Sequence, residues 1–101
     1  MAKAIYKFWR TRPTGFWYQL SKEHRDEHLA KMQHALEEVG GKSVLMCDAD
    51  WSSEEWRYVG VESFPDIEAV HAYARRLHAI DHYRYFHSES MLGTEVPWPT
   101  E

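Results

Sequence analysis

The chain has 101 residues and a formal net charge of −4, and it combines 15 aromatic residues with seven histidines. This length corresponds to a single domain, and a hydrophobic fraction of 44% with a charged fraction of 28% excludes a disordered or fibrous chain. The negative charge argues against nucleic acid as the main partner, because neutralising phosphates requires a clustered lysine and arginine surface. The single cysteine, Cys47, excludes an intramolecular disulfide and a cysteine-based zinc site.

The charged residues are unevenly distributed along the chain. The first 20 residues contain four basic side chains and no acidic one. We interpret these charges as solvated or paired with the acidic remainder, and an anionic ligand near this segment is the alternative. The chain has no apolar run of about 18 residues, the length of a membrane span, and its first residues lack the apolar stretch of a signal peptide. These features predict a soluble cytoplasmic protein without a membrane partner.

The first half of the sequence predicts a strand, a helix and a hairpin. Aromatic and β-favouring residues predict a strand over about residues 4–12. Residues 22–39 carry apolar side chains at helical spacing, and Ser21 before them is a typical N-cap. Two short runs, residues 43–49 and 56–64, then predict antiparallel strands joined by a polar connection.

The second half predicts another helix and a fourth strand. Pro65-Asp66 begins a helix whose apolar residues recur at a period near 3.6, and its end lies within residues 77–84. Residues 85–94 predict a strand, so residues 1–94 are expected to form one domain and residues 95–101 a C-terminal tail. The element order βαββαβ predicts an α+β, ferredoxin-like domain with a four-stranded antiparallel sheet and two helices on one face.

Apolar residues occupy both faces of the predicted strands. In the first strand, Tyr6 and Phe8 alternate with Ile5 and Trp9. A sheet with one face open to water normally carries polar residues on that face, and two helices cover only one face of a four-stranded sheet. The other face therefore needs a partner, and the sequence predicts an identical chain in a closed homodimer.

The element order, the two-faced strands and the turn Glu62-Ser63-Phe64-Pro65-Asp66-Ile67-Glu68-Ala69-Val70 resemble the dimeric α/β-barrel superfamily. The resemblance covers nearly the whole chain and implies that two ferredoxin-like subunits place their sheets face to face. It also implies a ligand site between the sheet and the helices of each subunit. The superfamily includes cofactor-independent monooxygenases, isomerases, haem-binding and haem-degrading enzymes, and small proteins with no assigned chemistry. The chain contains no complete catalytic motif of any branch.

The first predicted helix contains the run His24-Arg25-Asp26-Glu27-His28, which places two imidazoles one turn apart. A zinc hydrolase of that pattern needs a larger scaffold and a further ligand, so the run does not indicate a peptidase. His28 lies within the apolar stripe and is predicted to face the interior, whereas His34 lies on the opposite side and faces water.

Three histidines of the second predicted helix, His71, His78 and His82, fall on one flank if the helix continues that far. Both helices pack on the same sheet face, so this flank and His28 are predicted to approach one another. Neutral imidazoles suit a divalent transition metal, and one suffices as an axial haem ligand, with His78 and His82 as the candidates. Without a metal, His28, His78 or His82 would act as a general base near neutral pH. The sequence does not separate these roles.

Several aromatic side chains are candidate ligand contacts, although most of the rings are expected to fill the core and the dimer interface. The functional interpretation places Trp9, Trp17 and Tyr85 around a flat aromatic ligand. Arg10 would contact a carboxylate or phenolate of that ligand, and His71 would line the same pocket.

The leading functional prediction is a small homodimeric enzyme that acts on an aromatic or polyketide-like molecule. It would be a monooxygenase or isomerase that needs no cofactor and uses a histidine general base. One alternative is a protein that binds haem or a transition metal through its helix histidines. The other is a non-catalytic dimeric binding or stress-response module whose cavity is filled by its own side chains.

Overall fold

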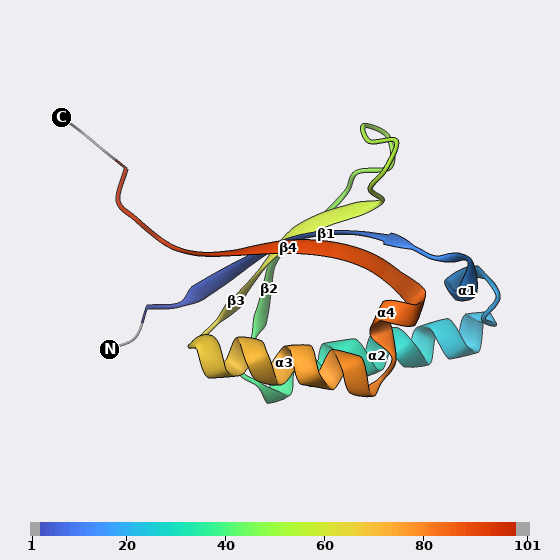
Figure 1. The fold of residues 1–101 in the computed structure, drawn as a ribbon, viewed down its shortest axis with the longest axis horizontal. Helices are drawn as coiled ribbons and strands as arrows, with labels where there is room; N and C mark the ends of the chain where they lie inside the picture. The colour runs from blue at the N-terminus through green and yellow to red at the C-terminus, as the bar shows by residue number, and fades with distance from the viewer. Residues whose placement is uncertain (1–2, 99–101) are drawn as a thin grey trace.

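The computed structural model describes residues 3–98 of the chain (Figure 1). The elements follow the predicted βαββαβ order, with two additional short helices, one directly after the first strand and one directly before the last. In chain order they are β1 (Ile5–Pro13), α1 (Gly15–Tyr18), α2 (Lys22–Glu38), β2 (Lys42–Asp48), β3 (Tyr58–Phe64), α3 (Ile67–Ala79), α4 (His82–Tyr85) and β4 (Phe86–Thr94). Residues 95–98 lie in no helix or strand, and residues 99–101 of the predicted tail are outside the described part.

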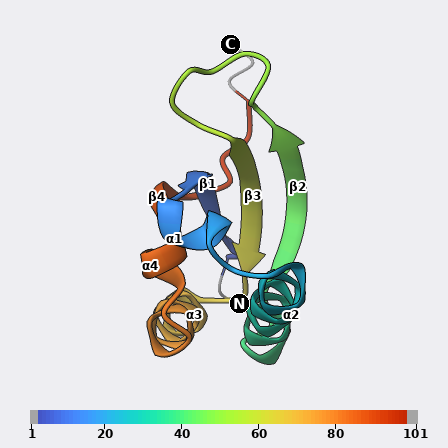
Figure 2. The ribbon, with the colours of Figure 1, turned by 90° about the vertical axis from the view of Figure 1, so that its right-hand side faces the viewer.

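The four strands form one antiparallel sheet in the order β2-β3-β1-β4. Both long helices lie on one side of this sheet (Figure 2). The register pairs Trp9 of β1 with Gly60 of β3 and Ser90 of β4, and these three residues are on the helix-facing side. Because side chains alternate along a strand, Phe8 and Arg10 are on the opposite side, which we call the open face. The arrangement confirms the predicted ferredoxin-like fold.

The two long helices begin and end at residues whose side chains or backbones suit those positions. The Ser21 hydroxyl accepts a hydrogen bond from the backbone N–H of His24 at 3.1 Å at the start of α2. Asp66 accepts one from the backbone N–H of Ala69 at 2.8 Å at the start of α3. Gly40, with φ of 78°, follows α2 in the left-handed conformation that commonly terminates helices. These caps explain why both starts were predictable.

The helix α3 ends before residue 82, so the side chain of His82 does not follow the helical spacing of α3. Asp81 has a φ of 62°, in the left-handed region that interrupts a right-handed helix. Aspartate occupies this region more readily than most non-glycine residues. His82 then begins the separate helix α4. The flank predicted for His71, His78 and His82 on a continuous helix therefore does not form.

The hydrophobic core lies between α2, α3 and one end of the sheet. Phe64 of β3 is 1% exposed and is the most deeply buried large side chain. Its partners in the buried cluster come from both long helices, namely Ala35, Leu36, Ala69, Val70, Tyr73 and Leu77. The core does not include β2, every residue of which is exposed. Within residues 3–98, no helix has both the length and the apolar character needed to cross a membrane.

An apolar row crosses the open face from one edge strand to the other. Phe8 is in register with Val61 and Met91, and Leu45 is in register with Val61. Phe8 is 51% exposed, Leu45 56% and Met91 72%. Cys47, in register with Val59 and on the same face of the edge strand β2, is also exposed. The part of the open face along this row is therefore apolar and uncovered.

Candidate functional site

Two histidines from different helices meet between α2 and α4. His28 and His82 are each 6% exposed, and His28 Nε2 lies 3.0 Å from His82 Nδ1. The two ring planes are parallel within 1°. One nitrogen donates and the other accepts, according to the tautomer of each ring. The buried position of His28 agrees with its place in the apolar stripe of the sequence.

Aromatic rings enclose this histidine pair. The rings of Trp17 and Tyr85 lie 5.7 Å and 5.1 Å from the His28 ring, measured between centroids. The Phe86 ring lies 4.9 Å from the His82 ring. Trp17 comes from α1, the single turn that follows β1, and is 8% exposed. The protein's own side chains therefore fill the space around the pair.

Burial keeps both histidines neutral at pH 7. It lowers the pKa of His82 to about 4, and the neighbouring His28 and Lys7 lower it further. Burial is also the main cause that lowers the pKa of His28, followed by Lys31, while Asp81 opposes the decrease. A neutral pair shares one proton in its hydrogen bond, which leaves one outer ring nitrogen as a donor and the other as an acceptor.

A second group of titratable residues lies on the helix-facing side of the sheet. Lys7 of β1 is directly opposite Glu62 of β3 in the register. The Tyr73 hydroxyl of α3 donates to Glu62 Oε2 at 3.4 Å, and Lys7 Nζ lies 5.3 Å from the centroid of the Tyr73 ring. No carboxylate within residues 3–98 forms an ion pair with Lys7. We call these three residues the lysine cluster.

Burial destabilises the charged form of each member of the lysine cluster. It lowers the pKa of Lys7, and the nearby Glu62 opposes this decrease. It raises the pKa of Glu62, and it raises the pKa of Tyr73 with a further contribution from Glu62. Sequence reasoning missed this cluster. The available signal was one charged residue among the alternate residues that share one face of each strand, but only the register shows that Lys7 and Glu62 face each other.

The indole of Trp9 lies across Gly60 on the helix-facing side. A Cβ atom at Gly60 would come within 2.5 Å of the indole Cζ2 atom and of the Leu45 carbonyl oxygen, so this approach requires glycine. Trp9 Nε1 is buried and has no hydrogen-bond partner within the described chain. Met46, in register with Gly60 and thus on the same side, is 59% exposed. An unsatisfied donor therefore lies beside an uncovered part of β2.

The sequence from residue 3 to residue 100 matches a family described as a family of unknown function, DUF6616. The chain belongs to this family. No match was found among curated proteins. Among solved structures, the chain is similar to a mutant chlorite dismutase from Candidatus Nitrospira defluvii, with a TM-score of 0.76 and 16% identity. It is also similar to a protein of unknown function from Rhodopseudomonas palustris, with a TM-score of 0.66 and 14% identity.

The extent of these similarities differs between the two proteins. The match to the dismutase covers 96% of this DUF6616 chain but only 42% of the dismutase chain. The match to the Rhodopseudomonas palustris protein covers 94% of this chain and 84% of that one. At these identities the similarity establishes the fold alone. That fold is the α+β ferredoxin-like fold that the sequence predicted.

The structure brings together four of the predicted site residues, which are His28, His82, Trp17 and Tyr85. His71 and His78 are instead exposed on α3. His78 packs against the ring of Tyr83, with 4.8 Å between centroids. The left-handed Asp81 separates these two histidines from the buried pair, so they do not line a common pocket with it.

Arg10 is separated from the other predicted ligand contacts by the sheet itself. It lies on the open face, where it forms an ion pair with Glu89, whereas Trp9 is on the helix-facing side. Arg12 pairs with Glu55 at 3.4 Å. A ligand bound on one side of the sheet would therefore contact Arg10 or Trp9 but not both. These two arginines are paired with acidic residues, as the sequence suggested for the basic first segment.

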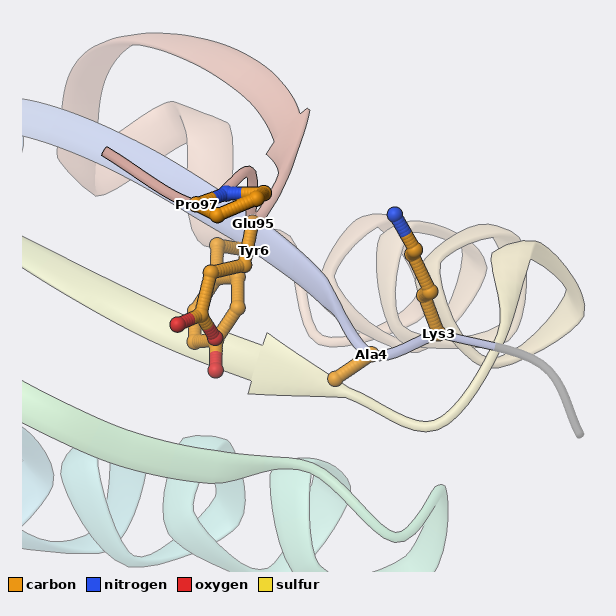
Figure 3. A pocket seen from close by; sticks show the side chains of 5 residues that line it. All are labelled: Lys3, Ala4, Tyr6, Glu95 and Pro97. Atoms are coloured by element: carbon orange, nitrogen blue, oxygen red, sulfur yellow. The ribbon is translucent and has the colours of Figure 1, made fainter. Parts of the chain in front are cut away.

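Two shallow surface hollows contain neither histidine nor tryptophan. One has a volume of about 370 Å³ and lies between the start of β1 and the C-terminal segment, where Lys3, Ala4, Tyr6, Glu95 and Pro97 line it (Figure 3). The other, of about 600 Å³, lies along the first turns of α2. Within the described residues, no three histidine, cysteine or acidic side chains come together in a way that would hold a metal ion.

Proposed function

We propose that this DUF6616 protein is a homodimeric binding protein that packs its open face against a second copy. Its ligand is an aromatic small molecule held on the helix-facing side, beside Trp9. The observation that carries the dimer is the uncovered apolar row formed by Leu45, Val61, Phe8 and Met91. Such a row spanning all four strands is costly to leave in water, because apolar surface gains about 25 cal/mol per Å² on burial.

The accessible surface of the single chain supports this proposal. The chain exposes 7340 Å², whereas a compact monomer of 12.0 kDa exposes about 6,000 Å² by the usual relation between mass and area. The excess is roughly 1,300 Å², and a standard interface buries about 800 Å² on each partner. Part of the excess belongs to the extended C-terminal segment (Figure 1). The total excess is larger than the area that one partner buries in a standard interface.

A binding function is better supported than proton abstraction by histidine. A general base works best when its pKa lies near the working pH, and burial lowers the pKa of His82 to about 4. The rings of Trp17, Tyr85 and Phe86 occupy the space that a substrate would need beside the pair. The His28–His82 hydrogen bond serves in this proposal to hold α4 against α2.

An aromatic ligand is supported by the surroundings of Trp9. Its indole offers a flat apolar surface together with an unsatisfied N–H donor. The neighbouring Met46 is 59% exposed and supplies an adaptable apolar contact at the edge of the sheet. A ring that carries an oxygen acceptor would satisfy both features.

Haem binding is a second candidate, favoured by the fold similarity to chlorite dismutase. A haem needs an imidazole with a free ring nitrogen that faces an apolar slot. The two buried histidines, His28 and His82, are hydrogen-bonded to each other and packed among aromatic rings. The other five are exposed and lack an enclosing wall, namely His24, His34, His71, His78 and His87. The residues present therefore do not fit a haem.

The dimer is tested by static light scattering of Phe8→Glu. The wild type is expected to scatter as twice 12.0 kDa, and Phe8→Glu as a single chain, because the new carboxylate would be buried without a partner. Leu29→Glu is the matched control, since Leu29 is 46% exposed on α2 and outside the open face. A monomeric wild type, or equal dissociation by both variants, would contradict the dimer.

Ligand binding is tested with 8-anilinonaphthalene-1-sulfonate, an aromatic anion whose fluorescence rises in apolar sites. Trp9→Leu is expected to weaken its binding by about tenfold, since loss of one stacking ring costs roughly 1 kcal/mol or more. Trp51→Leu, which alters a side chain 85% exposed in the β2–β3 loop, is the control. Unchanged binding by Trp9→Leu would exclude the site beside Trp9.

A haem titration separates the second candidate from the first. Added haem is expected to produce no Soret band beyond that of free haem in solution. A band that is lost in both His28→Ala and His82→Ala, but kept in the exposed control His71→Ala, would favour haem binding instead.

A further inference from the structure

The lysine cluster contains an amine without a counter-ion. Lys7 is partly buried, and no carboxylate of residues 3–98 lies within ion-pair distance of it. Its positive charge would face the ring of Tyr73 and, at longer range, the carboxyl group of Glu62 across the register. It also lies near enough to His82 to lower the pKa of that histidine. A lysine on an outer surface would be solvated instead. The environment therefore favours the neutral, nucleophilic amine.

The groups around this amine can donate or exchange protons. Burial raises the pKa of the Glu62 carboxyl group, and the Tyr73 hydroxyl donates a hydrogen bond to Glu62 Oε2 at 3.4 Å. The Trp9 N–H, on the next helix-facing residue of β1, has no acceptor within the described chain. A ligand that brings a carbonyl oxygen to the helix-facing side of β1 would supply the acceptor that this N–H lacks.

We infer that Lys7 captures an aromatic aldehyde or ketone as an imine, with Glu62 as the proton-transfer group. This inference rests on the proposed function, because it names the chemical class of the ligand held beside Trp9. It does not depend on dimer formation. The cluster is not sealed, since Leu92, opposite Lys7 on the edge strand β4 and on the same side, is 44% exposed.

The reaction is a condensation in which no atom is oxidised or reduced. The lone pair of Lys7 Nζ attacks the carbonyl carbon, and the carbonyl oxygen takes a proton from Glu62 to give a carbinolamine. Glu62 then accepts a proton from the nitrogen and delivers it to the hydroxyl group, which leaves as water while the C=N bond forms as a protonated imine. The remaining proton on that nitrogen returns to the Glu62 carboxylate, which gives the neutral imine. The reverse reaction releases the ligand, so capture is reversible. Tyr73 is a positioning residue that holds the Glu62 carboxyl group through its hydrogen bond.

The imine is tested by reductive trapping with benzaldehyde and sodium cyanoborohydride at pH 7. Intact mass and peptide mapping then report which lysines carry a benzyl group. Lys7 is expected to be labelled about tenfold faster than the exposed lysines, because burial lowers the pKa of its amine and a neutral amine is the nucleophile. The internal controls are the exposed Lys22, Lys31 and Lys42. Labelling that follows exposure, with Lys7 last, would overturn the inference.

Two variants identify the role of Glu62 and guard against misfolding. Glu62→Gln is expected to slow labelling of Lys7 by about tenfold or more, since it removes the proton-transfer group but keeps the shape. Lys42→Arg, a control on the exposed strand β2, should leave the rate at Lys7 unchanged. Lys7→Arg should remove this label entirely. Equal rates in wild type and a folded Glu62→Gln would contradict the proposed proton transfer.

Failure of this inference differs from failure of the proposed function. If 8-anilinonaphthalene-1-sulfonate binds beside Trp9 while Lys7 remains unlabelled, the ligand is held without a covalent bond and the imine is excluded. If the dye does not bind and Lys7 labels no faster than Lys22, the ligand site itself is excluded.

Discussion

Acidification between pH 6.5 and pH 4 is expected to destabilise the fold through His82. The pKa of this residue is about 4 in the folded protein, against 6.5 in an unfolded chain. In this window the unfolded state binds a proton that the folded state does not. The contribution of the neutral histidine is therefore complete above pH 6.5 and is lost as the pH falls towards 4.

The magnitude follows from the difference between the two pKa values. A difference of about 2.5 units corresponds to roughly 3–4 kcal/mol, at about 1.4 kcal/mol per unit. The pKa of His28 is also lowered by burial, so its protonation acts in the same direction. Domains of this size are commonly stable by only about 5–15 kcal/mol. The pair therefore controls a large part of the stability in mildly acidic solution.

Urea unfolding at a fixed protein concentration measures this effect across pH 4.5 to 7.5. The free energy of unfolding of the wild type should fall more steeply with acid than that of His82→Gln, which does not titrate. His71→Gln changes an exposed histidine of α3 and should follow the wild type. Parallel curves for wild type and His82→Gln would refute the reasoning, because protonation of His82 would then contribute nothing to the pH dependence of the free energy of unfolding.

Three further substitutions test local features of the fold. Asp81→Ala should lower the free energy of unfolding by about 1–2 kcal/mol more than Asp81→Gly in thermal denaturation, because only glycine adopts φ of 62° without a side-chain penalty. Gly60→Ala should displace the Trp9 indole and change its fluorescence, whereas Gly93→Ala, whose nearest atom would be 3.6 Å away, should not. Ser21→Ala removes the N-cap of α2 and should cost about 1 kcal/mol in urea unfolding.

The fold was predictable because its signals are local. Ser21 and Asp66 mark helix starts through side-chain hydrogen bonds to backbone groups only three residues away. The apolar residues of both strand faces indicated that the helices leave one face uncovered, and the exposure of Phe8 agrees with this. The break at Asp81 was not predictable from periodicity, since the apolar pattern of α3 continues past the residue at which the backbone turns.

The sequence predicted the position of a site residue only where the apolar spacing of a helix showed which side chains face the interior. The apolar stripe placed His28 in the interior, but its partner depended on the left-handed Asp81 that turns His82 inward. Lys7 and Glu62 were missed for another reason. They are 55 positions apart in the sequence, and their contact depends on the β1–β3 register, in which a shift of one residue would place them on opposite faces.

Because side chains alternate along β1, the proposed dimer interface and the lysine cluster lie on opposite sides of the sheet. Phe8, on the open face, lies between Lys7 and Trp9 on the helix-facing side. If the sheet only separates the two sides, Phe8→Glu should abolish dimerisation and leave labelling of Lys7 unchanged. If labelling falls with dissociation, and dilution of the wild type below its dimer dissociation constant lowers it equally, the second copy must hold β1 in the conformation that the lysine cluster needs. The dilution experiment separates this coupling from local damage by the glutamate, because it changes no residue.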